Sequence, residues 1–103
     1  MPEFSSVFSV KKSDRKLTRD ELIRAIRFSI AAEYEAVQIY TQLAESIDDK
    51  LAITVLLDVS NEELEHAGEF LKLLRQLNPD EEKHYEDGYK EVEDMMSRLK
   101  KKK

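Results

Sequence analysis

The sequence has no cysteine and only two glycines and two prolines in 103 residues. Without cysteine, this chain cannot form disulfide bonds, zinc–thiolate sites, rubredoxin-type iron sites or a thiol nucleophile. The lack of thiols is consistent with a reducing cytoplasm. Few glycines and prolines, together with 38% charged residues, favour helices over sandwiches or barrels. We therefore predict an all-α fold.

Long apolar runs are also missing, since none approaches the roughly 20 residues that a membrane span requires. The first ten residues, MPEFSSVFSV, have no basic leader and no long apolar core, so we expect no secretory signal and no membrane partner. The net charge is −5, although Lys100 to Lys103 contribute +4. An acidic chain of this kind repels nucleic acid and attracts cations.

The length is sufficient for one small domain. Such a domain buries a limited share of its surface and gains from self-association. Residues 1–17 show no periodicity, and we expect an arm whose apolar residues Phe4, Val7 and Phe8 are available to a neighbour. We expect the helical domain to span residues 18–98 and the lysine-rich residues 99–103 to form a solvated tail.

A capping-box pattern, Thr18-Arg-Asp-Glu21, predicts the start of the first helix. This helix should run from about residue 19 to about residue 47. One side of it carries residues spaced alternately by four and three, which is typical of a seam that faces a partner helix. The seam consists of Ile26, Ile30, Glu33, Val37, Tyr40, Ala44 and Ile47. A carboxylate therefore interrupts the middle of the row.

The second helix follows a short turn, Asp48-Asp49-Lys50, which sends it back antiparallel to the first. It should span about 51 to 77 and end before the stop signal Asn78-Pro79. Its seam consists of Ile53, Leu56, Ser60, Glu63, Ala67, Phe70, Leu74 and Leu77. A single carboxylate interrupts this seam as well.

A third helix is expected from Pro79 or Asp80, because acidic residues fill its first turn. Gly88 weakens it by up to ~1 kcal/mol relative to alanine, so a shorter or bent helix is expected. Its apolar stripe should pack on the hairpin or on another subunit. The stripe consists of Tyr85, Tyr89, Val92, Met96 and Leu99.

The two seam carboxylates, Glu33 and Glu63, should lie at similar height in the hairpin. The rise of an α-helix places each of them about 18 to 21 Å from the end of its helix at the connecting turn. An ionised carboxylate in an apolar seam must be paired, protonated or bound to a metal ion. His66 follows Glu63 by three residues, so both project from the same side. Glu33, Glu63 and His66 together suit iron, manganese or zinc. The alternative is that Glu33 reaches solvent or pairs with Arg27 or Arg75.

Ferritin-like di-iron bundles take a Glu from each of two helices and an E-x-x-H pair from each of the other two. This chain has one helix of each kind and therefore half a site. We predict that an antiparallel two-helix hairpin plus a shorter C-terminal helix dimerises into a ferritin-like four-helix bundle. The metal site then lies on the two-fold axis of a homodimer, and metal binding is coupled to dimerisation.

The blocks IAAEYEAVQIY (30–40) and LLDVSNEELEHAGEFLKLL (56–74) resemble the encapsulated ferritins, two-helix ferritin-like proteins housed inside encapsulin shells and related more distantly to rubrerythrins. The resemblance covers roughly residues 18–98. It implies an iron-oxidising dimer interface, a decameric ring of dimers and an encapsulin shell protein as partner. It also implies a cytoplasmic location within an encapsulin nanocompartment. Family members usually end in a linker and a short apolar targeting peptide, whereas this chain ends MMSRLKKKK.

By this resemblance, Glu33, Glu63 and His66 match the family's iron ligands, with Glu63 as the bridging carboxylate. Tyr40 matches the tyrosine beside the iron and completes the expected catalytic set.

The family's outer, metal-entry site matches only in part. Glu35 fits one of its residues, whereas Ala32 stands where another Glu is usual. Asp58, Glu62 and Glu65 are the further candidate ligands of an outer cation site.

We therefore predict a ferroxidase that oxidises Fe(II) to Fe(III) at a di-iron site, with two ions per dimer, for iron storage and detoxification. Zinc, manganese or calcium are the candidate substitutes. One alternative is a rubrerythrin-like peroxide reductase, which would need an external electron donor because this chain has no cysteine pairs. The other is a non-enzymatic helical assembly protein in which Zn²⁺ or Ca²⁺ only links the subunits.

Overall fold

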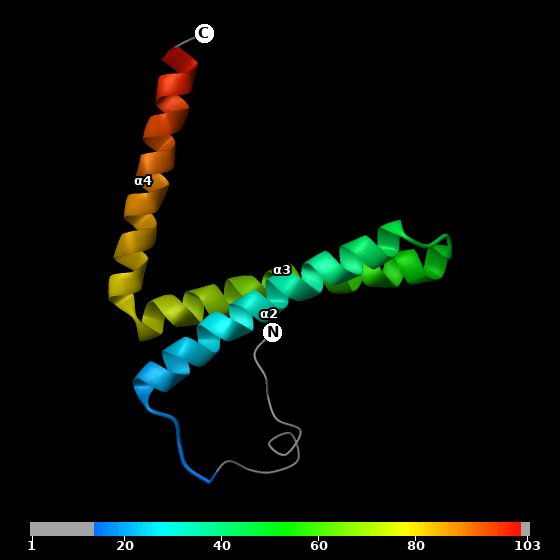
Figure 1. The fold of residues 1–103 in the computed structure, drawn as a ribbon, viewed down its shortest axis with the longest axis horizontal. Coiled ribbons are helices and arrows are strands. Elements are labelled where there is room, and N and C mark those ends of the chain that lie inside the picture. Colours follow the sequence, from blue (N-terminus) through cyan, green and yellow to red (C-terminus); the bar gives the residue numbers. More distant parts are fainter. Residues whose placement is uncertain (1–13, 102–103) are drawn as a thin grey trace.

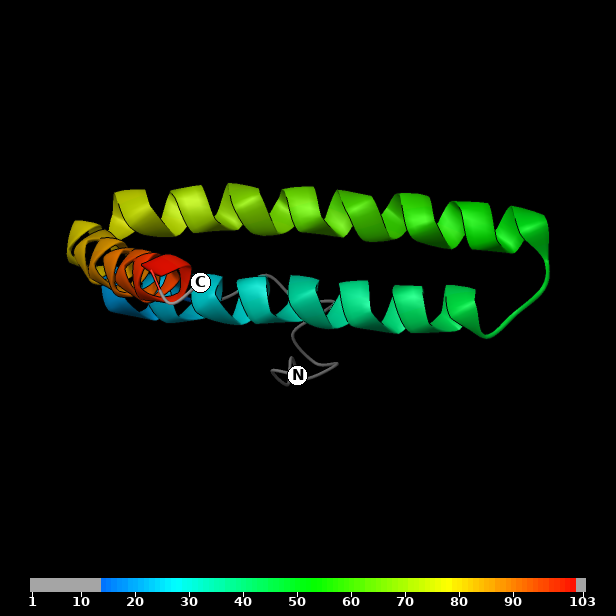
Figure 2. The same ribbon diagram turned by 90° about the horizontal axis from the view of Figure 1, so that it is seen from above.

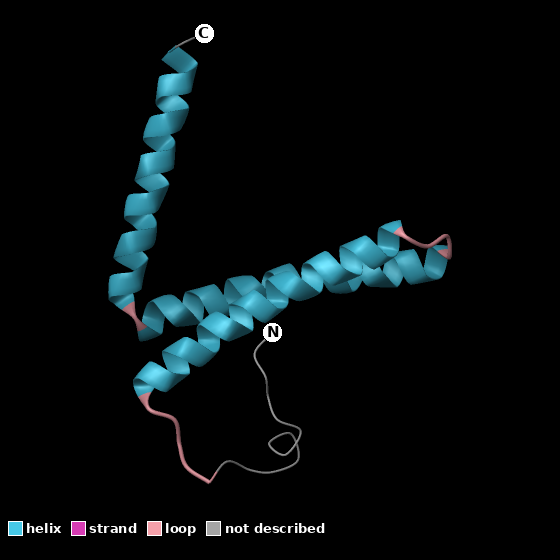
Figure 3. Ribbon diagram, viewed as in Figure 1, coloured by secondary structure: helices cyan, strands magenta, loops and turns pink. Residues whose placement is uncertain are grey.

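The computed structural model describes residues 14–101, which form three α-helices and, within that range, no strand (Figures 1 and 3). Helix α2 spans Arg19–Glu45, α3 spans Lys50–Leu77 and α4 spans Pro79–Lys101. Helices α2 and α3 lie side by side as an antiparallel hairpin (Figure 2). The predicted all-α fold and order of helices are confirmed. Within residues 14–101, none of the helices combines the length and apolar character of a membrane span.

The start of α2 is fixed by the predicted capping box. The Thr18 hydroxyl accepts a hydrogen bond from the backbone N–H of Glu21, and the Glu21 carboxylate accepts one from the backbone N–H of Thr18. Arg15 binds the same carboxylate with two nitrogens at 2.7 and 2.8 Å. This hydrogen bonding from Arg15, together with that from Thr18, lowers the pKa of Glu21 to about 2.

The connection between the helices differs slightly from the predicted turn. Helix α2 ends at Glu45 rather than near 47, and α3 begins at Lys50. Helix α2 is closed by Ser46, whose backbone N–H donates a hydrogen bond to the carbonyl oxygen of Leu43 at 3.0 Å. Helix α3 begins after Asp49, whose carboxylate caps it by accepting a hydrogen bond from the N–H of Ala52 at 2.8 Å. Ile47 therefore lies in the connection, where it is half-buried.

Both predicted seams face inward, and none of their residues is exposed. The apolar core lies toward the open end of the hairpin, where Ile23, Ile26 and Ile30 pack against Leu74. Leu74 is 1% exposed. Phe70, Leu71 and Leu77 cover this cluster. The middle of the hairpin, by contrast, holds the two seam carboxylates.

Between the carboxylates and the connection, a hydroxyl pair links the two helices. The side chain of Ser60 is 3% exposed, and its Oγ lies 3.1 Å from Oγ1 of Thr41 and 3.5 Å from the carbonyl oxygen of Val37. Buried polar groups need partners, and this pair supplies them only when the helices adopt one register. The pair therefore fixes how α2 and α3 align.

Helix α4 leaves the open end of the hairpin after a single non-helical residue, Asn78, and extends away from it (Figures 1 and 2). The corner is held by Glu81, which accepts hydrogen bonds from Arg27 of α2 and from Asn78 and Tyr85. The start of the expected stripe touches the hairpin, since Arg75 of α3 contacts Tyr85 and Tyr89. Beyond these residues, α4 does not pack on the described part of the hairpin.

At 23 residues α4 is the shortest of the three helices, as predicted, and it continues unbroken through Gly88. It also extends to Lys101, past the boundary expected at residue 98. Its last turn carries Arg98, Lys100 and Lys101, and cations at a helix C-terminus are favoured by the helix dipole. The predicted contacts of Phe4, Val7 and Phe8 lie outside the described residues.

Candidate metal centre

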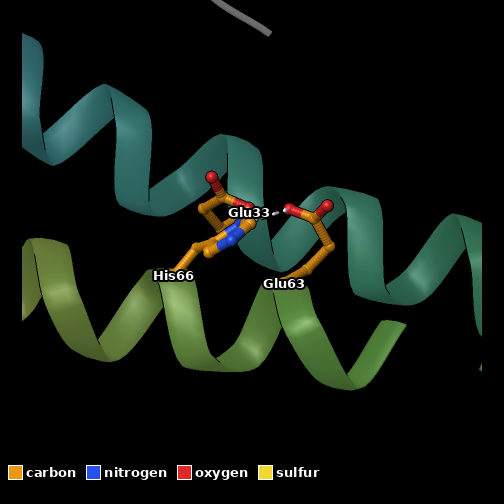
Figure 4. A group of neighbouring side chains, drawn as sticks. All are labelled: Glu33, Glu63 and His66. Carbon is orange, nitrogen blue, oxygen red and sulfur yellow. Dashed lines mark ion pairs between the residues drawn. The ribbon is translucent and has the colours of Figure 1, made fainter. Parts of the chain in front are cut away.

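Three side chains meet midway along the hairpin: Glu33 from α2, and Glu63 and His66 from α3 (Figure 4). One ligand atom of each lies within 4.8 Å of the others. Nδ1 of His66 is 3.5 Å from Oε2 of Glu63 and 3.7 Å from Oε2 of Glu33. Among residues 14–101, no other group of three such side chains is close enough to hold one ion.

The helices place these side chains as the sequence pattern predicts. Glu63 and His66 are three residues apart and project from the same side of α3. Glu33 occupies the equivalent level of α2 because the helices run antiparallel from a short connection. The predicted grouping of Glu33, Glu63 and His66 is therefore observed as a spatial cluster.

The cluster fits a cation. Oε2 of Glu33 is buried and has no hydrogen-bond partner, although it lies among polar neighbours. The distances of 3.5 and 3.7 Å to Nδ1 of His66 exceed normal hydrogen bonds. Two atoms that share an ion at about 2.1 Å are themselves roughly 3 to 3.5 Å apart, so only a small adjustment is needed. Two carboxylates and an imidazole suit iron, manganese or zinc.

The arginines that were alternative partners of Glu33 bind elsewhere. Arg27 binds Glu81 at 2.6 Å, and Arg75 donates a hydrogen bond to the hydroxyl of Tyr89 at 3.0 Å. Sequence reasoning missed both contacts, because nothing local in the sequence shows that the start of α4 folds against Arg27. The unpaired oxygen of Glu33 is thus left for another positive group.

One side of the cluster is open to solvent. The side chains of Glu33 and Glu63 are 18% and 19% exposed, whereas that of His66 is 47% exposed. Val55 and Leu73 lie eleven residues before and seven after His66, spacings that place all three on one side of α3. Both are exposed despite being apolar. The open side of the cluster is therefore flanked by uncovered apolar residues.

The other predicted site residues do not join the cluster. Tyr40 lies one heptad after Glu33 on the seam of α2 and is half-buried. The four candidate ligands of an outer site are all exposed, and within residues 14–101 they form no cluster that could hold an ion. Three of them, Asp58, Glu62 and Glu65, line one face of α3, while Glu35 lies on α2.

Comparison with known proteins agrees with this fold and site. A family model described as Rubrerythrin matches residues 25–102. The crystal structure of an encapsulated ferritin domain from Pyrococcus furiosus superposes with a TM-score of 0.82 at 33% identity, covering 92% of this chain and 97% of that domain.

Two curated relatives are similar in sequence. A ferritin-like-encapsulin shell fusion protein of Pyrococcus furiosus is 37% identical over 82 residues, which cover 80% of this chain and 24% of the relative. The encapsulin nanocompartment cargo protein EncC of Myxococcus xanthus is 39% identical over 70 residues, which cover 68% of this chain and 54% of the relative. The chain thus spans about a quarter and about half of their lengths.

The three-helix architecture with its carboxylate–histidine cluster is that of a ferritin-like protein. Within that class, the chain belongs to the rubrerythrin family, on its encapsulated-ferritin branch. Membership of this family supports an iron-related function, in the class of oxidoreductases. It also agrees with the carboxylate and imidazole donors, because ferritin-like bundles use such ligands for di-iron centres.

Proposed function

We propose that the chain is a ferroxidase whose substrate site is completed by a second copy across a two-fold axis. The observation that carries the proposal is Oε2 of Glu33, which is buried and without a hydrogen-bond partner beside Glu63 and His66. An unpaired carboxylate oxygen is costly to bury, and a bound cation removes that cost. The acidic chain, with a net charge of −5, favours the arrival of cations.

The need for a second copy follows from the ligand count. A single chain offers one Glu on α2 and one Glu with His on α3, whereas a ferritin-like di-iron site takes twice that number. Two chains related by a two-fold axis supply four carboxylates and two imidazoles. The exposed apolar residues Val55 and Leu73, on the side of α3 that carries His66, supply the surface that such a dimer buries.

The ligand types suit the reaction. Two Fe(II) ions bound between the copies would each give up one electron to dioxygen and become Fe(III), while the dioxygen would take up the two electrons and two protons and leave as hydrogen peroxide. Carboxylate oxygens stabilise the harder, more highly charged product, while the imidazole of His66 favours Fe(II). Ile30 and Ala67 are buried next to the ligand positions along the seams and limit the access of water. Tyr40, half-buried on the same seam, is proposed to lie beside the iron.

We further propose that the product is stored in an encapsulin compartment, with the dimers assembled into a decameric ring. Two named relatives support the compartment, since one is an encapsulin cargo protein and the other a fusion with an encapsulin shell. The hairpin interior is filled by side chains and leaves no room for a mineral. The four exposed acidic residues Glu35, Asp58, Glu62 and Glu65 are proposed to attract cations toward the site.

The test is anaerobic loading with Fe(II) followed by exposure to air. We expect one iron per chain in the dimer and rapid growth of Fe(III) absorbance. His66→Ala and Glu63→Ala should reduce the oxidation rate at least ~100-fold, because losing even a residue that only orients a metal ligand typically costs about 10- to 100-fold. His84→Ala is the matched control, because His84 is exposed on α4 and distant in sequence from the cluster.

Other outcomes would point to the alternatives. Metal-dependent dimers without oxidation would indicate a structural metal site. Consumption of peroxide well ahead of dioxygen would indicate the alternative of a rubrerythrin-like peroxide reductase. Oxidation that continues at the wild-type rate in both His66→Ala and Glu63→Ala would refute the proposed site.

A further inference from the structure

An apolar groove lies on the side of α2 that is turned away from the inward seam. The groove has a volume of about 410 Å³ and is lined by Arg24, Arg27, Phe28 and Ala31. Their helical spacing places all four on one side of α2. Phe28 is two residues from both Ile26 and Ile30 of the seam, and residues two apart on a helix face different ways. Phe28 therefore faces solvent and is 55% exposed.

The groove combines this exposed aromatic ring with a free positive charge. Arg24 stands one turn before Phe28, and within residues 14–101 its side chain takes part in no hydrogen bond or ion pair. Arg27, by contrast, is bound to Glu81. An uncovered ring beside an unpaired cation favours a partner that brings an apolar side chain together with a carboxylate.

We propose that this groove binds the N-terminal segment of the same chain, residues 1–13, with Phe4 against Phe28 and Glu3 beside Arg24. The N-terminal segment lies outside the described residues. Glu3 is the only charged residue among the first ten, and it is next to Phe4. The segment therefore offers the two kinds of side chain that the groove favours. Pairs of aromatic rings also attract each other beyond the area that they bury.

The N-terminal segment is long enough to reach the groove. Phe28 lies about 14 Å along α2 from Arg19. The chain from Asp14 to Arg19 spans at most about 17 Å, and the chain from Phe4 to Asp14 spans up to about 33 Å. Phe28 is thus within reach even if residues 14–18 are directed away from the groove. Because both partners belong to one chain, no second molecule has to be brought to the site.

The two parts of the contact should contribute unequally. The affinity comes chiefly from removing the rings of Phe4 and Phe28 from water. An ion pair between Glu3 and Arg24 would be exposed, and exposed pairs add little stability. Its main effect is to orient the segment. Substitutions of the aromatic residues should therefore have larger effects than substitutions of the charged residues.

Tryptophan fluorescence tests the contact, because the native chain has no tryptophan. In Phe4→Trp, docking should shift the emission to shorter wavelengths and protect the indole from acrylamide. Adding Phe28→Ala should lower the docking equilibrium constant about tenfold or more, from the loss of the buried aromatic area, and should remove both effects. Leu43→Ala is the matched control, since Leu43 is an exposed apolar residue farther along α2.

Two results of this experiment would refute the docking. One is an emission of Phe4→Trp that already equals that of a fully exposed tryptophan. The other is an equal effect of Leu43→Ala and Phe28→Ala.

Mixed assemblies test whether the segment binds its own chain. Chains with both Phe4→Trp and Phe28→Ala carry the reporter but a damaged groove, whereas Phe4→Ser chains carry an intact groove and no reporter. The two kinds of chain are refolded together from urea, with Phe4→Ser chains in excess. The emission should stay that of an exposed tryptophan. A shift to shorter wavelengths would show that the segment docks on another copy and would overturn the intrachain contact.

Charge reversal tests the position of Glu3. Glu3→Lys in the Phe4→Trp background should weaken the protection from acrylamide at low ionic strength, because it places like charges together. Adding Arg24→Glu should restore the protection. Lack of recovery in this charge-swapped chain would overturn the assignment of Glu3 to Arg24.

The inference does not depend on the ferroxidase proposal, and the two can fail separately. Phe28 faces away from the seam that carries Glu33, so Phe28→Ala should leave the Fe(II) oxidation rate per chain within about twofold. An exposed emission of Phe4→Trp with normal oxidation rejects only the docked segment. A protected tryptophan without oxidation rejects only the ferroxidase.

Discussion

Arg27 on α2 binds Glu81 on α4 through two hydrogen bonds, 2.6 Å from Nη2 to Oε1 and 3.3 Å from Nε to Oε2. The residues are far apart in the sequence, so this contact joins the last helix to the first. Glu81 also accepts hydrogen bonds from Asn78 and Tyr85. Chiefly because of the hydrogen bond from Arg27, the pKa of Glu81 falls to about 2 from an ordinary value of 4.5.

The first prediction concerns this ion pair and pH. Arg27→Met should lower the free energy of unfolding only modestly at pH 7, because the arginine is half exposed and water screens the ion pair. A carboxylate whose pKa is lowered in the folded state adds stability above its unfolded pKa and loses it as the pH falls. The difference between wild type and Arg27→Met should therefore shrink from pH 4.5 to about 2.

Urea unfolding of the metal-free protein at several pH values measures this difference. Arg24→Met is the matched control, because Arg24 is an exposed arginine of the same helix. It should have little effect at any pH in this range. A difference between wild type and Arg27→Met that grows on acidification would contradict the assigned role of Glu81.

The second prediction concerns the hydroxyl pair of Thr41 and Ser60. Ser60→Ala should cost about 1 to 2 kcal/mol, because the Thr41 hydroxyl loses its partner across the hairpin. The double variant Thr41→Val with Ser60→Ala should cost less than the sum of the single changes, since the partners are removed together. Denaturant unfolding of the four proteins in the cycle measures this coupling.

Ser29→Ala is the control for the hydroxyl pair. Ser29 is half-buried, whereas Ser60 is fully buried, and the Ser29 hydroxyl donates to the carbonyl oxygen of Ala25 in the same helix. Its removal should leave the hairpin register unchanged. Strictly additive effects of Thr41→Val and Ser60→Ala would show that the two hydroxyls do not stabilise each other.

The third prediction separates metal binding from folding at Glu33. Glu33→Gln should leave the metal-free protein as stable as wild type or more so, because it removes the charge from a buried carboxylate oxygen that has no hydrogen-bond partner. The same change should abolish the stabilisation by metal, which for wild type is about 2.7 kcal/mol when the free ion is at 100 times its dissociation constant. Thermal unfolding with and without Mn²⁺ reads out both effects.

Glu45→Gln serves as the control for Glu33→Gln, since Glu45 is exposed at the end of the same helix. It should retain the full metal-dependent increase in melting temperature. If Glu33→Gln also retained that increase, Glu33 would not be a ligand.

The fourth prediction concerns the dimer that we propose completes the metal site. Val55→Glu should raise the dimer dissociation constant about tenfold or more, because burying a valine contributes roughly 1.5 kcal/mol or more. The Fe(II) oxidation rate per chain should then fall on dilution at higher protein concentrations than in wild type. Stopped-flow absorbance over a concentration series measures this shift.

Leu57→Glu is the control for Val55→Glu. Leu57 is similarly exposed, and lies two residues away on a different side of α3. Its change should leave the concentration dependence of oxidation unaffected. Equal shifts for both variants would indicate a general loss of stability instead of a loss of the dimer.

Much of the candidate site could be predicted from the sequence because helical periodicity is local. The spacing of three and four places Glu33 and Glu63 on inward faces, and no residue of either seam is exposed. The short connection then fixes the antiparallel direction, which brings the carboxylates level. Thr18 and Glu21 likewise set the start of α2 through contacts within one turn.

Only the tertiary structure decided the contacts between residues distant in sequence. The choice of Glu81 as the partner of Arg27, the pairing of Thr41 with Ser60 and the direction of α4 depend on how whole helices are placed. The sequence pattern predicts an apolar stripe on α4 but does not predict where the helix lies, because such a stripe can pack on its own hairpin or on another molecule. The sequence alone therefore determined the helices and the inward carboxylates, while the packed structure decided which surfaces remain open to a partner.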